Sequence, residues 1–221
     1  MNRLRTIAAV AALALAGTAG AQTTYTGTGN AGSATARADF LASLSGLSYT
    51  EDFDSRAIGS NSVVLPGVGV FGGGNGVRSG NPFPYGGTTT SLSNGYELYT
   101  DGGSGTASGS FAAPISAFGF YATDLENPFS VLVTLVGGTT STFTIPGFND
   151  AGRVFYGLNF GANVVSAVTL TAAAGDAVLL DDVTVAANAA ASTVPEPSTW
   201  ALMGSGLLGL AGVARRRRAT R

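Results

Sequence analysis

The amino-acid sequence predicts an all-β protein, an antiparallel β-sandwich of the jelly-roll kind preceded by one short helix. From Leu47 onward, apolar and polar residues alternate with a period of two in a series of short runs, as in half-buried strands. Turn residues, mostly drawn from 33 glycines, separate these runs closely. Closely spaced short strands of this kind are typical of an antiparallel sandwich or jelly roll. The chain shows no internal repeat, which argues against a solenoid or a propeller.

The elements follow in order along the chain. Gln22–Ser33 is a polar, Gly-rich lead-in, and Ala34–Leu44 predicts a short amphipathic helix, with Phe40, Leu41 and Leu44 at one-turn spacing. Tight turns are predicted in the Gly-containing segments 136–139 and 173–176. The predicted strands are Leu47–Asp54, Ser62–Val70, Gly95–Thr100, Ile115–Thr123, Phe129–Val136, Thr140–Ile145, Arg153–Phe160, Val164–Thr171 and Ala177–Val185.

Two Gly-rich segments attract functional interpretations. Gly72–Gly87 is rich in Gly and Pro, which predicts a loop, and its Phe83 and Tyr85 are candidates for a sugar-stacking surface. Packing of these rings beneath the loop is the alternative. Gly67–Gly72 matches the dinucleotide-binding pattern GxGxxG, but no helix is predicted after it to receive a pyrophosphate. We therefore interpret that match as chance.

Composition excludes several functional classes. The sequence has no His and no Cys, so a Ser-His-Asp triad, a thiol nucleophile, a disulfide framework and an ordinary zinc site are excluded. Gln22–Val194 contains four arginines against twelve acidic residues, a net charge of −8. So acidic a segment offers nothing that would attract nucleic acid. Oxygen ligands remain available, and these suit a hard cation such as Ca²⁺.

The first 21 residues predict a secretory signal peptide. Arg3 and Arg5 form its positive region and Ile7–Ala16 its apolar core. A small-x-small cleavage site formed by Ala19 and Ala21 precedes Gln22. The chain is therefore expected to be exported, with signal peptidase as its first partner.

The C-terminal region combines three features in order. Pro195, Glu196 and Pro197 come first, and Thr199–Ala214 is an apolar run that predicts a transmembrane helix. As a helix this run would span roughly 24 Å, less than the ~30 Å hydrocarbon core of a bilayer. Four cations follow it and favour a cytoplasmic end: Arg215, Arg216, Arg217 and Arg218. The small-residue segment 187–194 is a predicted linker.

This order of Pro-Glu-Pro motif, short apolar helix and Arg cluster resembles a PEP-CTERM sorting signal. The resemblance implies a Gram-negative bacterium that makes exopolysaccharide, and an exosortase that processes the signal at the inner membrane. It further implies transient anchoring there, followed by release to the cell surface or matrix. An ordinary C-terminal membrane anchor is the alternative.

Carboxylates interrupt two predicted apolar strand faces. A period of two puts Asp181 on one face with Leu179, Val183 and Val185, and puts Glu51 on one face with Leu47, Tyr49 and Phe53. A buried carboxylate is costly unless a partner or a cation neutralises it. We therefore predict a structural Ca²⁺ site that includes Glu51 and Asp181, with Asp54 and Asp182 as second-choice ligands. Pairing with water or with Arg56 at a sheet edge is the alternative.

The same strands carry a second resemblance. A first strand ending in Phe-Asp and a last strand reading Leu-Asp-Asp-Val-x-Val are similar to galactose-binding-like jelly rolls and related carbohydrate-binding modules. In those families the first and last strands lie near each other and often share a structural calcium.

The predicted organisation is a signal peptide (1–21), a lead-in with a helix (22–46), a β-sandwich (47–186), a linker (187–194) and a sorting signal (195–221). Asp124 and Glu126 form a carboxylate pair, but no catalytic signature surrounds them, so we predict that the protein is not an enzyme. The expected function is binding or structural support at the cell surface or in the exopolysaccharide matrix. A secreted carbohydrate-active enzyme and a ligand-free structural protein are the alternatives.

Overall fold

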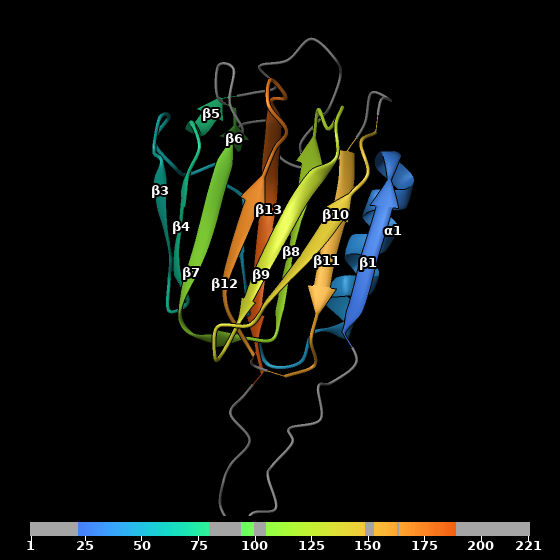
Figure 1. Cartoon of the computed structure of the whole chain (residues 1–221), viewed down its shortest axis with the longest axis vertical. Coiled ribbons are helices and arrows are strands. Elements are labelled where there is room, and N and C mark those ends of the chain that lie inside the picture. The colour runs from blue at the N-terminus through green and yellow to red at the C-terminus, as the bar shows by residue number, and fades with distance from the viewer. Residues whose placement is uncertain (1–21, 80–93, 100–104, 149–152, 163, 189–221) are drawn as a thin grey trace, which may run out of the picture. The chain divides into compact units, whose positions relative to one another are not determined.

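A computed structural model describes residues 22–79, 94–99, 105–148, 153–162 and 164–188. The chain divides into two compact units, Met1–Ala189 and Ala190–Arg221, and every described residue belongs to the first. That unit is a sandwich of two antiparallel sheets with one helix, as the sequence predicts (Figure 1).

One sheet, here sheet A, has seven strands. They run in the order β1-β11-β8-β13-β6-β5, and β2 also pairs with β13. Because β13 is long, β2 pairs with its second half and β6 with its first. The bounds are β1 (Thr23–Thr28), β2 (Leu47–Glu51), β5 (Gly76–Ser79), β6 (Asn94–Leu98), β8 (Ala117–Thr123), β11 (Arg153–Asn159) and β13 (Val178–Ala187).

The other sheet, here sheet B, has six strands in the order β10-β9-β12-β7-β4-β3. In most of these strands buried and accessible residues alternate, so that one face meets the core and the other meets solvent. The bounds are β3 (Ser62–Leu65), β4 (Gly69–Gly73), β7 (Thr106–Ile115), β9 (Phe129–Leu135), β10 (Thr140–Ile145) and β12 (Val165–Thr171).

The core lies between the two sheets and contains most of the buried aromatic residues. Phe120 stacks against both Phe129 and Tyr156, with ring centroids 5.9 and 6.2 Å apart. Burial raises the pKa of Tyr156 to about 12, so its hydroxyl stays neutral inside the sandwich.

Helix α1 (Gly29–Ser43) covers part of the outer face of sheet A and builds a second, smaller core there. Its Phe40 is fully buried against Phe155 and packs near Tyr25 of β1. Glycines in the sheet make room for this ring: a Cβ on Gly157 would lie 2.7 Å from Phe40 Cδ2. The helix is therefore held by packing on side chains of sheet A, with glycines leaving room for the Phe40 ring.

The structure corrects several predicted boundaries. Ser62–Val70 is not one strand, because a turn around Gly67 (φ +70°) folds it into the β3–β4 hairpin. Part of the predicted loop Gly72–Gly87 is strand: β4 ends at Gly73 and β5 spans Gly76–Ser79. The GxGxxG segment ends in β4, with no helix after it.

Strands β1 and β7 were not predicted from the sequence. β1 is rich in Thr, which favours strands, but it lacks the alternating apolar residues that mark a half-buried strand. β7 is rich in Ser, Gly and Ala and carries few large apolar residues. Pairing holds them in place: β1 lies along β11, and β7 lies between β12 and β4. The helix also begins earlier than predicted, at Gly29 instead of Ala34.

Candidate functional site

Glu51, the first predicted calcium ligand, ends β2 and is buried. Arg56 binds it with both prongs of its guanidinium: Nε donates to Oε1 at 3.1 Å, and Nη2 pairs with Oε2. The Tyr49 hydroxyl donates to Oε2 at 2.8 Å, and the Phe53 amide donates to Oε1 at 3.1 Å. Both carboxylate oxygens thus have protein donors.

These contacts decide the charge of Glu51. Burial alone would raise the pKa of Glu51, but the hydrogen bonds from Arg56 and Tyr49 outweigh it, and the pKa is lowered. The hydrogen bond to Glu51 raises the pKa of Arg56. At neutral pH the pair is therefore a bidentate ion pair between a carboxylate and a guanidinium.

Asp181, the second predicted ligand, does not share a strand face with Val183 and Val185. Asp182 has a φ of +48°, and between Asp181 and Thr184 the pairing of β13 with β8 shifts by one residue. This bulge breaks the period-two alternation. As a result Val183 and Val185 face the core, whereas Asp181 lies opposite Tyr121, a member of the smaller core under α1.

The register therefore separates the two proposed ligands. Glu51 lies opposite Val183, on the core side of sheet A, whereas Asp181 shares the outer side with Tyr121. Among the described residues, no group of three or more acidic side chains is placed to hold a metal ion. The calcium site stays a prediction, and these contacts do not favour it. Equal melting temperatures in millimolar calcium and in chelator would refute it.

The second-choice ligands also have protein partners. Asp54 Oδ1 accepts a hydrogen bond from the Asn94 amide at 3.2 Å, which fixes the start of β6. Asp182 Oδ2 lies 3.2 Å from Arg37 Nη2 of α1. Each of these carboxylates connects an element of the sandwich to its neighbour.

A cluster that sequence reasoning missed joins α1 to sheet A. The guanidinium of Arg153 lies 4.7 Å from the centre of the Tyr121 ring, and that of Arg37 lies 5.8 Å from it. Arg153 Nε also donates to Ser33 Oγ of α1 at 3.1 Å. The ring thus receives cations from both the helix and β11. Arg153 and Ser33 lie more than a hundred positions apart in the sequence, so no local sequence pattern indicates this cluster.

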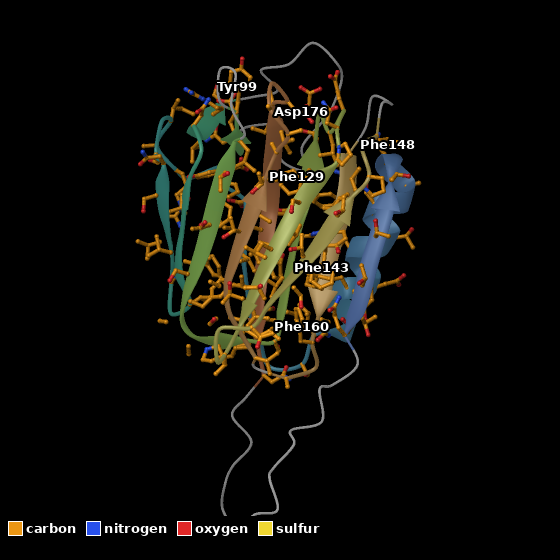
Figure 2. The ribbon with its side chains drawn as sticks, viewed as in Figure 1. Tyr99, Phe129, Phe143, Phe148, Phe160 and Asp176 are labelled. Carbon is orange, nitrogen blue, oxygen red and sulfur yellow. The ribbon has the colours of Figure 1, made fainter. Side chains whose placement is uncertain are left out.

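Three further acidic residues gather at one end of the sandwich, where Figure 2 labels Asp176. Burial raises the pKa of Asp124, and the charges of Glu126 and Asp176 raise it further. Asp176 accepts a hydrogen bond from the Asn127 amide at 3.0 Å, which ties two loops together. Asp124 also has a φ of +59°, a conformation that Asp tolerates in turns. The geometry is that of a partly buried turn in which Asp176 is buried, Glu126 is exposed and the carboxylates repel one another.

Several predicted features lie outside the described residues. These are the signal cleavage site, Phe83 and Tyr85 of the predicted sugar-stacking loop, and the whole C-terminal signal from Pro195 to Arg218. In the part of the chain that the structure describes, no helix is long and apolar enough to cross a membrane.

Comparison with known protein families finds a match in the C-terminal region. Residues 193–218 match the model of the PEP-CTERM protein-sorting motif. No curated protein matches the chain.

The similar solved structures are distant. The K2 cleaved adhesin domain of Lys-gingipain has a TM-score of 0.42 at 14% identity, covering 63% of this chain and 99% of that one. A mutant of CBM29-2, a family 29 carbohydrate binding module, has a TM-score of 0.40 at 13% identity, covering 68% and 99%. TmCBM61 in complex with beta-1,4-galactotriose has a TM-score of 0.34 at 13% identity, covering 61% and 92%.

Proposed function

We propose that this is an exported protein, processed by an exosortase near Pro195–Pro197, whose sandwich acts by binding or structure at the cell surface or in the exopolysaccharide matrix. The sorting motif matched at 193–218 carries this proposal, because it indicates a secreted, exosortase-processed protein. A Gram-negative host and transient anchoring in the inner membrane by 199–214 belong to the same proposal. In that step Arg215–Arg218 would hold the tail on the cytoplasmic side until it is cut.

The chemistry of the domain supports binding over catalysis. With no His, Cys or Lys in the sequence, general acid–base catalysis would depend on carboxylates and tyrosines. Glu51, Glu97 and Asp182, however, are engaged with arginines in ion pairs. Pairs of this kind hold elements in position.

Processing is tested by intact-mass analysis of the protein recovered from its native host. We expect the mature protein to lack both the signal peptide and Trp200–Arg221. Recovery of the full C-terminal tail on the mature protein would leave only the ordinary membrane anchor.

The role of the domain is tested with residues 22–194, which contain both sheets, α1 and the whole described core. A glycan array reports binding, and a reducing-sugar assay reports hydrolysis. We expect binding without sugar release. Sugar release would establish the enzyme alternative, and silence in both assays would favour a ligand-free structural role.

A further inference from the structure

The solvent-facing side of sheet B is an ordered array of hydroxyl groups, here called the hydroxyl face. Strand pairing aligns its residues in rows that cross the sheet. The central row consists of Thr142, Leu132, Thr169, Ser108, Gly72 and Ser62. The row on one side consists of Thr140, Thr134, Ala167, Ser110, Val70 and Val64. The shorter row on the other side consists of Thr144, Ser130, Thr171 and Thr106.

Charge is absent from this face. The six strands of sheet B contain no acidic or basic residue, although the segment 22–194 has a net charge of −8. Solvated sheet faces are ordinarily polar, and about a quarter of the residues of a soluble domain are charged. The face itself carries no charge that would repel a ligand. The net negative charge of the rest of the domain repels an acidic ligand, so a neutral ligand is favoured.

The hydroxyl face is accessible. Thr140, Thr142 and Thr144 of β10 are exposed, as are Thr106, Ser108 and Ser110 of β7. Among the described residues, α1 lies on the other sheet (Figure 1). At its β3–β4 edge the face carries an apolar pair, Val64 and Val70, which are 60% and 41% exposed.

The chemistry of this array matches one class of ligand. A Ser or Thr hydroxyl both donates and accepts hydrogen bonds, as does a sugar hydroxyl. Burying hydroxyl and methyl groups under a ligand costs much less than burying charges. Ser108 Oγ and Thr169 Oγ1, 3.2 Å apart on neighbouring strands, already show that the hydroxyls of a row can bond one another. The exposed valines offer contacts to the C–H face of a sugar ring.

The geometry of the sheet restricts the class of ligand further. Neighbouring strands lie about 4.8 Å apart, and alternate residues along a strand about 7 Å apart. Adjacent strands are rotated by about 20–25°, so the rows are not coplanar across six strands. A rigid crystalline surface would therefore meet only part of the array, whereas a flexible chain can follow its twist.

We infer that the hydroxyl face of sheet B binds flexible, uncharged polysaccharide chains. This inference rests on the proposed function, since it names the surface and the ligand class through which the domain would hold to a polysaccharide matrix. It differs from the sugar-stacking prediction at Phe83 and Tyr85, because it uses hydroxyls and valines in place of aromatic rings.

The test is affinity electrophoresis of residues 22–194 in gels containing dextran, pullulan or galactomannan, with the acidic polymer alginate as comparison. Ser108→Glu and Thr142→Glu place a charge on the hydroxyl face. Thr35→Glu, at an exposed position of α1, is the matched control. Ser108→Thr keeps the hydroxyl. Melting temperatures establish that each variant is folded.

We expect at least one neutral polymer to retard the wild type, Ser108→Thr and Thr35→Glu equally. Ser108→Glu and Thr142→Glu should bind about threefold to tenfold more weakly, the factor for losing about one hydrogen bond. If folded face variants bind as tightly as the wild type, the surface is wrong while the binding function stands. Retardation by alginate alone would overturn the neutral ligand class. No retardation in any gel would overturn this inference and favour the ligand-free structural role, and it would leave the proposed sorting untouched. A concentration-dependent dimer that Ser108→Glu abolishes would instead assign the face to a second copy of the chain.

Discussion

The two sheets of the sandwich differ most in where they carry charge. The strands of sheet A contain Glu51, Arg78, Glu97, Arg153, Asp181 and Asp182, whereas the strands of sheet B contain no charged residue. Sheet A is also the sheet that α1 covers. Among the described residues, the charges of the strands thus lie in the sheet that α1 covers, where three of the acidic residues pair with arginines, and the other sheet displays hydroxyls.

The largest expected effect comes from breaking the buried pair of sheet A. Arg56→Met removes the main partner of Glu51 and leaves a buried carboxylate with two neutral donors. We expect the free energy of unfolding to fall by about 3 kcal/mol, measured by urea denaturation at pH 7. Arg78→Met is the matched control: it breaks the more exposed pair with Glu97, and should cost at most about 1 kcal/mol. Equal losses would show that burial of the pair does not matter.

The same variant predicts a pH dependence. In the wild type the pKa of Glu51 is lowered from 4.5, so its stabilisation is complete above that value and is lost as pH falls through the lower folded-state pKa. In Arg56→Met burial dominates and the pKa of Glu51 should rise. The difference in melting temperature between the two proteins should therefore be largest above pH 5 and shrink toward pH 3. A constant difference would contradict the ion pair as its cause.

The next effect concerns the packing of α1 on sheet A. In Gly157→Ala the new methyl group would lie 2.7 Å from Phe40 Cδ2 and 3.0 Å from Phe155 Cε1, so the helix must move. Overpacking of this kind costs about 1–3 kcal/mol. Gly32→Ala, on the exposed side of α1, meets nothing closer than 3.9 Å and should instead stabilise by about 0.5 kcal/mol. Thermal melting of the two variants gives the comparison, and a neutral Gly157→Ala would contradict it.

A smaller effect is expected at the acidic end of the sandwich. Asp124→Asn removes a carboxylate whose pKa is raised by burial and by its neighbours, and Asn tolerates the positive φ. A raised pKa means that the ionised form costs stability above the folded-state pKa and that this cost disappears as pH falls. The variant should gain at most about 0.5 kcal/mol at pH 7, because solvent screens the repulsion, and nothing at pH 3. A loss of stability at pH 7 would indicate an attractive role for Asp124.

The smallest effect is expected on the hydroxyl face. Ser108→Ala removes one exposed hydroxyl and its 3.2 Å contact with Thr169. We expect a change in unfolding free energy within about 0.5 kcal/mol, as for ordinary surface substitutions. A loss above 1 kcal/mol in urea denaturation would mean that the hydroxyls of sheet B serve stability, as the charges of sheet A do.

Periodicity predicted the strands that bury an apolar face, and it failed where pairing or a bulge decides the structure. Thr140–Ile145 and Phe129–Leu135 alternate cleanly, and β10 matches its predicted bounds. Strand β7 carries few large apolar residues, so only its two neighbours define it. In β13 the left-handed conformation of Asp182 moves Asp181 to the opposite face, and no rule of alternation anticipates such a bulge.

The candidate sites were predictable to different degrees. The C-terminal sorting motif is local in sequence and was recognised from its residues. The partner of Glu51 was available as an alternative, because Arg56 lies five residues away. The contacts of Arg37 with Asp182 and of Arg153 with Ser33 join residues more than a hundred positions apart. The rows of the hydroxyl face likewise become visible only once the register of six strands is known.

The proposal that sheet B binds polysaccharide while sheet A serves stability is tested most directly by nuclear magnetic resonance. Backbone amide shifts of ¹⁵N-labelled residues 22–194 would be recorded during titration with the neutral polysaccharide that retards the protein most. We expect the largest shifts in β7, β9, β10 and β12, with α1, β2 and β13 unchanged. Shifts concentrated around α1, β2 or β13, with sheet B unperturbed, would contradict it.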